Sequence, residues 1–352
     1  MNAPFTPVCE GMREARLDEP DERDRIEAFV AEQGGTVFHR PAWLLAVEEG
    51  TGQAATGLIA ERGDIITGWL PLTDMRSPIF GCALVSSGFG MEGGILATTN
   101  AAAERLASCA EELAGRRACT ELEVRGGPLP ENWQRIEGKH AIFARDLAEN
   151  DEAQMLAVPR KQRAEIRKGL NSDLTVRLGC DQTNRAAHYI VYATSVRNLG
   201  TPVFPRRLFD AVLDRLDADI LTIEADGMPV ASVLSIYHAG TVMPYWGGGL
   251  PAARGLRAND RMYFELMRHA RERGCHRFDF GRSKIGSGPF AFKKNWGFEP
   301  RPLAYAKWIA PGCQVRSTDP TSDSNAAKIA LWQKLPLGLA NRIGPFIARG
   351  LG

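Results

Sequence analysis

The stretch ILTIEADGMPVASVLSIYHAGTVMPYWGGG, residues 220–249, carries the clearest fold signal in the chain. Apolar and polar residues alternate over 220–225 and 229–238, which predicts two half-buried strands. The Asp226-Gly227 pair between them is typical of a tight hairpin turn. A third strand is predicted over 242–249 and ends in three glycines. This part of the chain is therefore expected to form a hairpin followed by a glycine-bearing strand.

A helix and a further strand are predicted after this hairpin. Asn259 is placed to cap a helix from Asp260 to about Arg273, Gly274 ends that helix, and 277–280 has the pattern of a strand. The same order of elements recurs in the first half of the chain. Its members there are the strands 56–60 and 65–72 with the turn 61–64, the Gly-rich stretch 83–97, the capping pair Thr99-Asn100, a helix to about Ala114 and the strand 120–124.

The repeated order predicts an α/β protein that arose by internal duplication. Each copy is expected to form one lobe, a mixed sheet flanked by helices, and the two lobes should superpose. The expected boundaries are an N-terminal lobe over 1–150 and a C-terminal lobe over 151–312. The second lobe includes a helical connector with a basic segment, and 313–352 is expected to be a linker and an amphipathic tail.

Composition limits the function classes. The 352 residues carry 43 basic and 42 acidic side chains, so a net charge of +1 argues against a DNA-binding protein. Seven cysteines are scattered without metal or disulfide spacing, which favours reduced thiols and a cytoplasmic location. No signal peptide, membrane span, metal-ligand cluster or Ser-His pairing is predicted.

Four motifs carry a family resemblance. They are FDFGRSKIGSGPFAFKKNWGFEP at 278–300, VPRKQRAEIRKG at 158–169, VRNLGTPVFP at 196–205 and YWGGGLPAARGLRANDRMYFELM at 245–267. Together they resemble the FemAB-like acyltransferases, and among these the branch found with exosortase/PEP-CTERM exopolysaccharide loci of Gram-negative bacteria. The resemblance implies two tandem GNAT-type lobes and N-acyl or aminoacyl transfer to an amine on a cell-envelope precursor. It implies no tightly bound cofactor, and the acyl donor is left open between acyl-CoA and aminoacyl-tRNA.

The resemblance also implies a reactive centre at Phe292-Lys293. In Fem-type enzymes a Phe-Lys pair lies at the acyl-transfer centre, so the Lys293 cation would stabilise developing negative charge and the Phe292 carbonyl would orient the amine. Lys294 is a neighbouring binding candidate. Trp296 replaces the more usual Phe, and a single Gly297 replaces a Gly pair. From the residues alone, a solvated turn is the better explanation of the two lysines, because lysine is mostly exposed.

The preceding strand ends in further candidates. Asp279 is a candidate general base, acting directly or through water, and Arg282 and Ser283 lie just beyond the strand, where ligands of α/β sheets gather. A structural Asp279–Arg282 ion pair is the alternative. Asn259 begins a helix whose N–H groups suit an anion, with simple capping as the alternative.

Several basic and polar residues are candidate binding groups for a phosphate-bearing carrier and its amine acceptor. Arg160, Arg163 and Arg167 recur on one helical stripe, and a solvated basic face is the alternative. Arg197 and Asn198, at a helix end, either bind acceptor or only shape the turn. Tyr245 and Trp246, which open the YWGGG segment, complete the predicted set of substrate-binding residues.

The tail mixes apolar with basic residues. That composition suits peripheral contact with the anionic inner membrane, and docking on the catalytic lobe explains it equally well. For the whole chain, the sequence predicts an acyltransferase. A binding or scaffold protein of envelope-glycan assembly that has lost turnover is the alternative.

Overall fold

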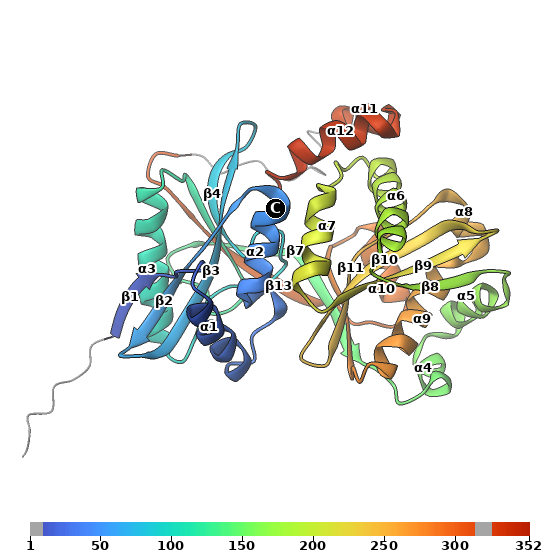
Figure 1. The fold of residues 1–352 in the computed structure, drawn as a ribbon, viewed down its shortest axis with the longest axis horizontal. Coiled ribbons are helices and arrows are strands. Elements are labelled where there is room, and N and C mark those ends of the chain that lie inside the picture. Colours follow the sequence, from blue (N-terminus) through green and yellow to red (C-terminus); the bar gives the residue numbers. More distant parts are fainter. Residues whose placement is uncertain (1–9, 314–325) are drawn as a thin grey trace, which may run out of the picture. The chain divides into compact units, whose positions relative to one another are not determined.

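A computed structural model describes residues 10–313 and 326–352, with 326–328 described in backbone only. The chain forms two compact units (Figure 1). Unit 1 contains residues 1–136, 304–318 and 350–352, and unit 2 contains residues 137–303 and 319–349.

Unit 1 is built around a sheet with the strand order β1-β2-β3-β4-β6-β13, in which β5 also pairs with β3. Its β4–β6 pair is parallel, and the other pairs are antiparallel. The strands are β1 (Glu10–Glu14), β2 (Ala54–Arg62), β3 (Ile65–Ser77), β4 (Gly81–Ser86), β5 (Leu96–Ala97), β6 (Glu121–Arg125) and β13 (Arg301–Ile309). The helices are α1 (Pro20–Glu32), the 3-10 turn η1 (Val37–His39), α2 (Pro41–Thr51) and α3 (Asn100–Arg116).

Unit 2 has a sheet with the order β7-β12-β11-β10-β9-β8, in which only the β11–β12 pair is parallel. The strands are β7 (Gln134–Asp146), β8 (Thr175–Gly179), β9 (Ala218–Ala225), β10 (Met228–His238), β11 (Thr241–Gly249) and β12 (Arg277–Lys284). The helices are α4 (Asp151–Ala157), α5 (Arg160–Asn171), α6 (Gln182–Asn198), α7 (Arg206–Arg215), α8 (Pro251–Leu256), α9 (Ala258–Glu272), α10 (Gly288–Asn295), α11 (Ala326–Lys334) and α12 (Leu337–Ala348).

The repeated order of elements predicted from the sequence is present in both units. Each has an antiparallel hairpin (β2–β3, β9–β10), a strand antiparallel to it (β4, β11), a helix (α3, α9) and a strand parallel to the third (β6, β12). The predicted α/β fold with a mixed sheet flanked by helices is therefore confirmed. The hairpin turn is also as predicted, because Asp226 and Gly227 both have positive φ, 51° and 73°.

The last strand of each sheet comes from the other half of the sequence. Strand β7 follows unit 1 along the chain but pairs with β12, and β13 follows β12 but pairs with β6. The chain consequently passes from unit 1 to unit 2 at residue 137 and returns to unit 1 at residue 304. The predicted boundaries were at residues 150 and 312. Neither strand was predicted from the sequence. Local periodicity would also not have identified the strand with which each of them pairs.

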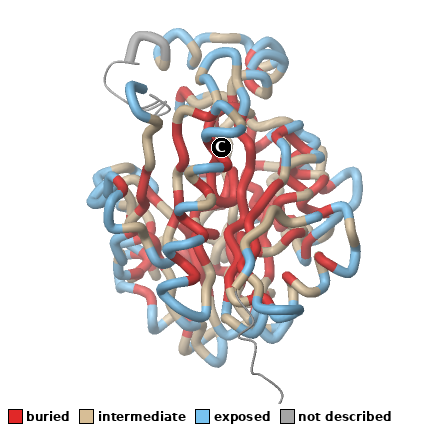
Figure 2. The backbone as a smooth tube through the Cα atoms, turned by 90° about the vertical axis from the view of Figure 1, so that its left-hand side faces the viewer, coloured by how far each residue is buried: buried red, intermediate tan, exposed pale blue. Residues whose placement is uncertain are grey.

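Side-chain alternation decides which helices cover each face of a sheet. In unit 1, Leu58 and Leu70 face the α3 core, while Ile59 and Trp69 face α1 and α2. In unit 2, Leu221 and Val233 join the core that contains α9 residues, while Thr222 and Ser232 lie on the side of α6, where Ser232 bonds His188. Figure 2 shows the buried stretches of the backbone, in red, mostly inside and the exposed stretches, in pale blue, mostly outside. Both sheets therefore lie between helical layers.

Two predicted helix starts have different outcomes. Thr99 caps α3, accepting a hydrogen bond from the Ala102 N–H at 3.1 Å, as predicted. Asn259 was wrongly predicted to cap the second helix. Helix α9 begins at Ala258, and its N-cap is Arg257, a left-handed residue (φ 56°) that joins the unpredicted helix α8 directly to α9.

Candidate active site

The candidate site begins with a β-bulge in strand β12. Asp279 pairs with Ala144 of β7 and Arg282 pairs with Ile142, so the bulged strand has one residue more than its partner between these two pairs. Gly281 permits this because its φ is +70°, which a side chain would disfavour. The carboxylate of Asp279 accepts a hydrogen bond from the Gly281 N–H at 2.7 Å. The bulge turns backbone carbonyls away from the sheet ladder.

Helix α10 brings Lys293 onto those carbonyls. The helix begins after Ser287, whose hydroxyl accepts from the Phe290 N–H at 3.3 Å. Lys293 Nζ donates to the carbonyl oxygens of Gly281 at 3.0 Å and Arg282 at 3.1 Å. The residue is only 9% exposed, and Nζ lies 5.6 Å from the ring centre of Phe143. Lys293 is thus a buried lysine on a helix, and not part of the solvated turn that was the alternative from the sequence.

The pKa values of Lys293 and Asp279 are both shifted from those of free side chains. Burial lowers the pKa of Lys293 to about 7, and the negative charge of Asp279 only partly opposes that shift. Burial also raises the pKa of Asp279, against the Gly281 hydrogen bond and the Lys293 charge. Both groups therefore titrate closer to neutrality than free side chains do, which is the property expected of acid–base or charge-stabilising groups.

Aromatic side chains surround the bulge. Phe280 has its ring centre 4.7 Å from that of Phe298, 5.0 Å from Tyr263 and 6.1 Å from Trp296. Tyr263 also lies 5.6 Å from Phe292. These rings lower the local dielectric, so burial penalises the charge on Lys293. They also exclude water from one side of the site.

Two buried donors in this region have no protein partner. Within residues 10–313 and the described tail, nothing accepts a hydrogen bond from the indole N–H of Trp296, and the hydroxyl of Ser283 has no partner. Trp296 is fully buried and Ser283 is 6% exposed. Buried polar groups are usually satisfied, so such atoms mark a place where a ligand or water is expected to bind.

The two parallel strands separate next to this cluster. Thr241 pairs with Arg277 and Val242 with Phe278, and the pairing stops there although both strands continue. Tyr263 contacts both strands beyond that point, because its ring packs on Phe280 and its hydroxyl would lie 3.3 Å from a β-carbon on Gly247. The facing backbone edges are thus not bonded to each other.

The other predicted residues fall into three groups. Phe292, Arg282 and Ser283 lie beside Lys293, while Lys294 is exposed on the same helix. Tyr245 and Trp246 lie on β11, with Trp246 packed on Phe209 at 4.8 Å. The third group, which lies on helices, comprises Asn259, Arg160, Arg163, Arg167, Arg197 and Asn198.

The basic stripe lies on α5. Arg160 and Arg167 are exposed, Arg163 is partly buried, and the opposite side of the helix packs on α9 through Gln162, Ile166 and Gly169. Lys168, by contrast, pairs with Glu165 at 2.9 Å. The stripe therefore presents cations on a helix that is anchored by its other face.

The remaining helical candidates make contacts of their own. The amide of Asn259 lies against Gly249, where a β-carbon would be 2.6 Å from its Oδ1. Arg197 donates to the Gln333 carbonyl at 2.9 Å, and the Asn198 carbonyl accepts from Gln333 Nε2 at 3.0 Å. Arg197 and Asn198 thus hold helix α11 in the structure.

Sequence reasoning missed Gly281, Tyr263 and Phe143. A glycine inside an otherwise strand-like run, Phe278–Lys284, was the available signal for the bulge. Tyr263 and Phe143 had no such signal, because a single aromatic residue on a helix or strand is ordinary core. Among the described residues, no group of three or more His, Cys, Asp or Glu is arranged to hold a metal.

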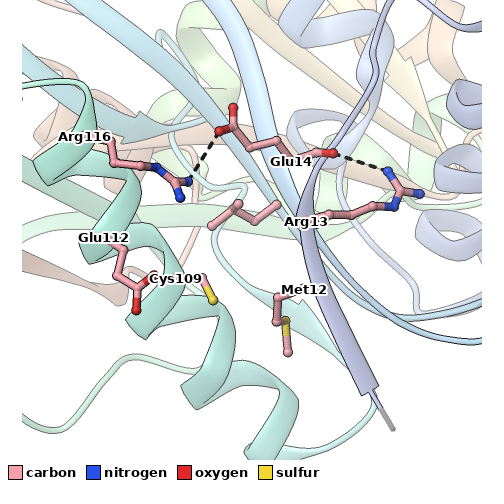
Figure 3. Close-up of a pocket in the computed structure, with 7 residues that line it drawn as sticks. Met12, Arg13, Glu14, Cys109, Glu112 and Arg116 are labelled. Atoms are coloured by element: carbon pink, nitrogen blue, oxygen red, sulfur yellow. Dashed lines mark hydrogen bonds and ion pairs between the residues drawn. The ribbon is translucent and has the colours of Figure 1, made fainter. Parts of the chain in front are cut away.

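A separate pocket of about 340 Å³ lies in unit 1 (Figure 3). It is formed by β1 and α3, and none of the predicted site residues lines it. Its lining residues are Met12, Arg13, Glu14, Leu58, Cys109, Glu112 and Arg116. Arg13 pairs with Glu22 at 2.6 Å, and Arg116 pairs with Glu14 at 3.5 Å. Because these ion pairs already occupy its arginines, the pocket is a weaker candidate than the Lys293 site.

Comparisons with known proteins place the site in a recognised domain. Residues 160–294 match the family described as acetyltransferase (GNAT) domain, a span that includes Asp279, Phe292 and Lys293. No curated protein matches the sequence.

Solved structures share the fold at low sequence identity. FemX superposes with a TM-score of 0.63 at 15% identity over 82% of this chain and 96% of its own. A tandem GNAT protein from the clavulanic acid biosynthesis pathway gives 0.55 at 14% identity, over 87% of this chain and 100% of its own. The C-terminal domain of a putative lysylphosphatidylglycerol synthetase from Agrobacterium fabrum gives 0.55 at 15%, over 82% and 92%. The protein therefore has a tandem GNAT fold, and its matched domain supports acyl transfer as the general class of reaction.

Proposed function

We propose that this protein is an N-acyltransferase that moves an acyl or aminoacyl group to an amine on a cell-envelope or exopolysaccharide precursor. The observation that carries the proposal is Lys293, a buried lysine held on the carbonyls of a β-bulge inside the matched GNAT domain. The similarity in fold to FemX and to a putative lysylphosphatidylglycerol synthetase supports an aminoacyl or acyl group as the cargo.

The proposed step forms a C–N bond. A neutral amine attacks the carbonyl carbon of the donor, and the C–O bond to tRNA or the C–S bond to CoA then breaks. The proton that the amine loses leaves with the carrier, as its hydroxyl or thiol. The carbonyl oxygen gains negative charge on the way, and a positioned cation stabilises it. Lys293 uses two of its three N–H donors on Gly281 and Arg282, which leaves the third for this oxygen.

The remaining groups have supporting roles in this scheme. Asp279 accepts the proton that the amine loses, directly or through water, and its raised pKa suits that task. Beyond Val242 and Phe278 the ladder between β11 and β12 ends, and the diverging strands offer backbone groups to the acyl chain. Arg160, Arg163 and Arg167 bind phosphates of the carrier or of a nucleotide-linked acceptor.

The test is a transfer assay with both donor classes. Purified protein is incubated with isotope-labelled acyl-CoA or aminoacyl-tRNA and a panel of amino-sugar nucleotides, and free carrier is measured together with labelled acceptor. We expect one carrier released per labelled acceptor formed. Tight binding of donor or acceptor with no released carrier would instead identify a scaffold protein.

A further inference from the structure

Helix α12 buries its small residues and exposes its large apolar ones. Ala340 is 1% exposed and Ala348 is fully buried, whereas Leu339, Ile343 and Phe346 are 44%, 40% and 49% exposed. The three large residues recur at i, i+4 and i+7 and so form one stripe, here called the α12 stripe. A surface helix of a soluble protein normally turns its large apolar residues inward. This reversed arrangement indicates that the stripe has an external apolar partner.

The inner face of helix α12 packs tightly on the rest of unit 2. This packing fixes the direction in which the α12 stripe points. A β-carbon on Gly344 would lie 3.1 Å from the backbone nitrogen of Val203. A β-carbon on Gly200 would likewise collide with the side chain of Ile329 in α11. The hydrogen bonds of Arg197 and Asn198 with Gln333 add a polar anchor. Rotation that would bury the α12 stripe would lose these contacts.

The charged residues of the segment that contains the α12 stripe are all basic, which favours an anionic partner. Residues 326–352 contain Lys328, Lys334, Arg342 and Arg349 and no Asp or Glu. Arg342 is exposed and lies within the stripe, between Leu339 and Phe346. Leu331 of α11, 67% exposed, extends the apolar surface. Most of both helices is drawn as exposed or intermediate at the top of Figure 2.

We propose that α11 and α12 bind unit 2 to the surface of an anionic membrane, with the α12 stripe among the acyl chains and the exposed Lys334 and Arg342 side chains at the lipid phosphates. Apolar burial and attraction to anionic lipid together account for a helix of this composition lying in the interface. A second copy of the chain would bring two all-basic segments together, which like-charge repulsion disfavours. No helix among the described residues is long and apolar enough to span a bilayer.

Vesicle flotation of the full-length chain tests the proposal. Vesicles of phosphatidylcholine alone are compared with vesicles containing 30% phosphatidylglycerol, about the anionic fraction that gives a negative surface potential. The wild type should float with the anionic vesicles and lose binding as salt is added. The triple variant Leu339→Ser, Ile343→Ser, Phe346→Ser should bind at least tenfold more weakly, and Arg342→Gln about fivefold more weakly.

The matched control removes three apolar residues elsewhere that are even more exposed than those of the α12 stripe. Ile65, Leu156 and Met228 are 71%, 62% and 66% exposed, and their triple Ser variant should bind vesicles like the wild type. Thermal unfolding verifies that each variant is folded. Wild type that stays unbound, or equal binding by wild type and the α12 variant, overturns the proposal. So does a dimer seen by light scattering that the α12 variant abolishes while vesicle binding is absent, since that result assigns the stripe to self-association.

Discussion

Among the residues whose burial the structure describes, each unit has one buried lysine, and the two lysines have opposite surroundings. In unit 1, Lys307 of β13 bonds Glu121 and Glu123 of β6, the second at 3.0 Å, and Arg125 bonds Glu123 at 2.7 Å. Although burial opposes it, the charges of Arg125 and Lys307 lower the pKa of Glu123 to about 2. In unit 2, Lys293 has backbone carbonyls as its hydrogen-bond acceptors and a pKa of about 7.

The difference separates a structural lysine from a reactive one. A buried cation that is fully paired with carboxylates is locked in one protonation state and joins two strands. A buried lysine whose hydrogen-bond acceptors are neutral carbonyls has a pKa near neutral pH, and it keeps an N–H donor for a substrate. Both units have the same order of elements, and of these two lysines the one in unit 2 is poised for reaction.

The largest effect is expected from breaking the unit 1 network. Lys307→Met leaves Glu121 and Glu123 buried without their shared cation, which should lower the free energy of unfolding by about 3–5 kcal/mol. Denaturant unfolding measures this loss. Lys293→Met is the comparison and should cost less stability, because the hydrogen bonds of Lys293 go to backbone carbonyls and Asp279 keeps its bond from the Gly281 N–H. Equal losses in both variants would contradict the distinction between the two lysines.

The next effect is on catalysis at Lys293. Lys293→Met keeps much of the side chain's packing but removes the charge, so turnover should fall by about 10²–10³, with little change in ground-state binding. Steady-state and single-turnover kinetics of the transfer assay give both quantities. Lys294→Met is the matched control, since Lys294 is exposed on the same helix and should retain activity. A similar loss in both would mean that the helix supplies only diffuse positive charge.

A smaller effect per residue is expected from the basic stripe. Replacing Arg160, Arg163 and Arg167 by Gln should weaken binding of a phosphate-bearing ligand by about 1.5–3 kcal/mol for each charge-assisted hydrogen bond lost. Calorimetric titration with CoA and with a nucleotide sugar measures this at several salt concentrations. The control replaces the exposed Arg62, Arg105 and Arg135 of unit 1. Unchanged affinity of the stripe variant would assign these arginines to a solvated face.

A pH dependence of stability should distinguish the two lysines further. Burial lowers the folded pKa of Lys293 to about 7 from an ordinary 10.5, so the unfolded chain binds more protons between these values. The free energy of unfolding should therefore rise with pH across that window, by at most about 1.4 kcal/mol per pH unit. Unfolding of wild type minus Lys293→Met isolates the contribution. A flat difference from pH 7 to 10 would show that the lysine is fully charged when buried.

The smallest expected effect concerns helix starts. Thr99→Ala should cost about 1 kcal/mol, because the Thr99 hydroxyl caps α3 through the Ala102 N–H. Asn259→Ala should cost less, since α9 begins after Arg257 and Asn259 is not its cap. Thermal unfolding of the two variants compares them directly. A larger loss from Asn259→Ala would indicate that its amide is structurally important against Gly249.

Local signals were sufficient for the repeat. The alternation over 220–238, the Asp226-Gly227 turn and the Thr99 cap each depend on a few consecutive residues, and all three are present in the structure. The Phe292-Lys293 centre was suggested by resemblance, and its neighbours Arg282 and Ser283 by their place at the carboxyl end of a strand. The linker predicted up to residue 325 lies mostly outside the described residues.

What the sequence by itself determined are therefore the elements whose causes are local: periodic strands, a glycine turn and a capped helix. Only the tertiary structure decided that β7 pairs with β12 and β13 with β6, that Lys293 is buried, and that α12 turns its large apolar residues outward. The physical reason is that pairing, burial and pKa depend on contacts between residues far apart in the chain. A lysine on a helix is exposed by default, and only the bulge at Gly281 together with the surrounding aromatic rings makes this one different.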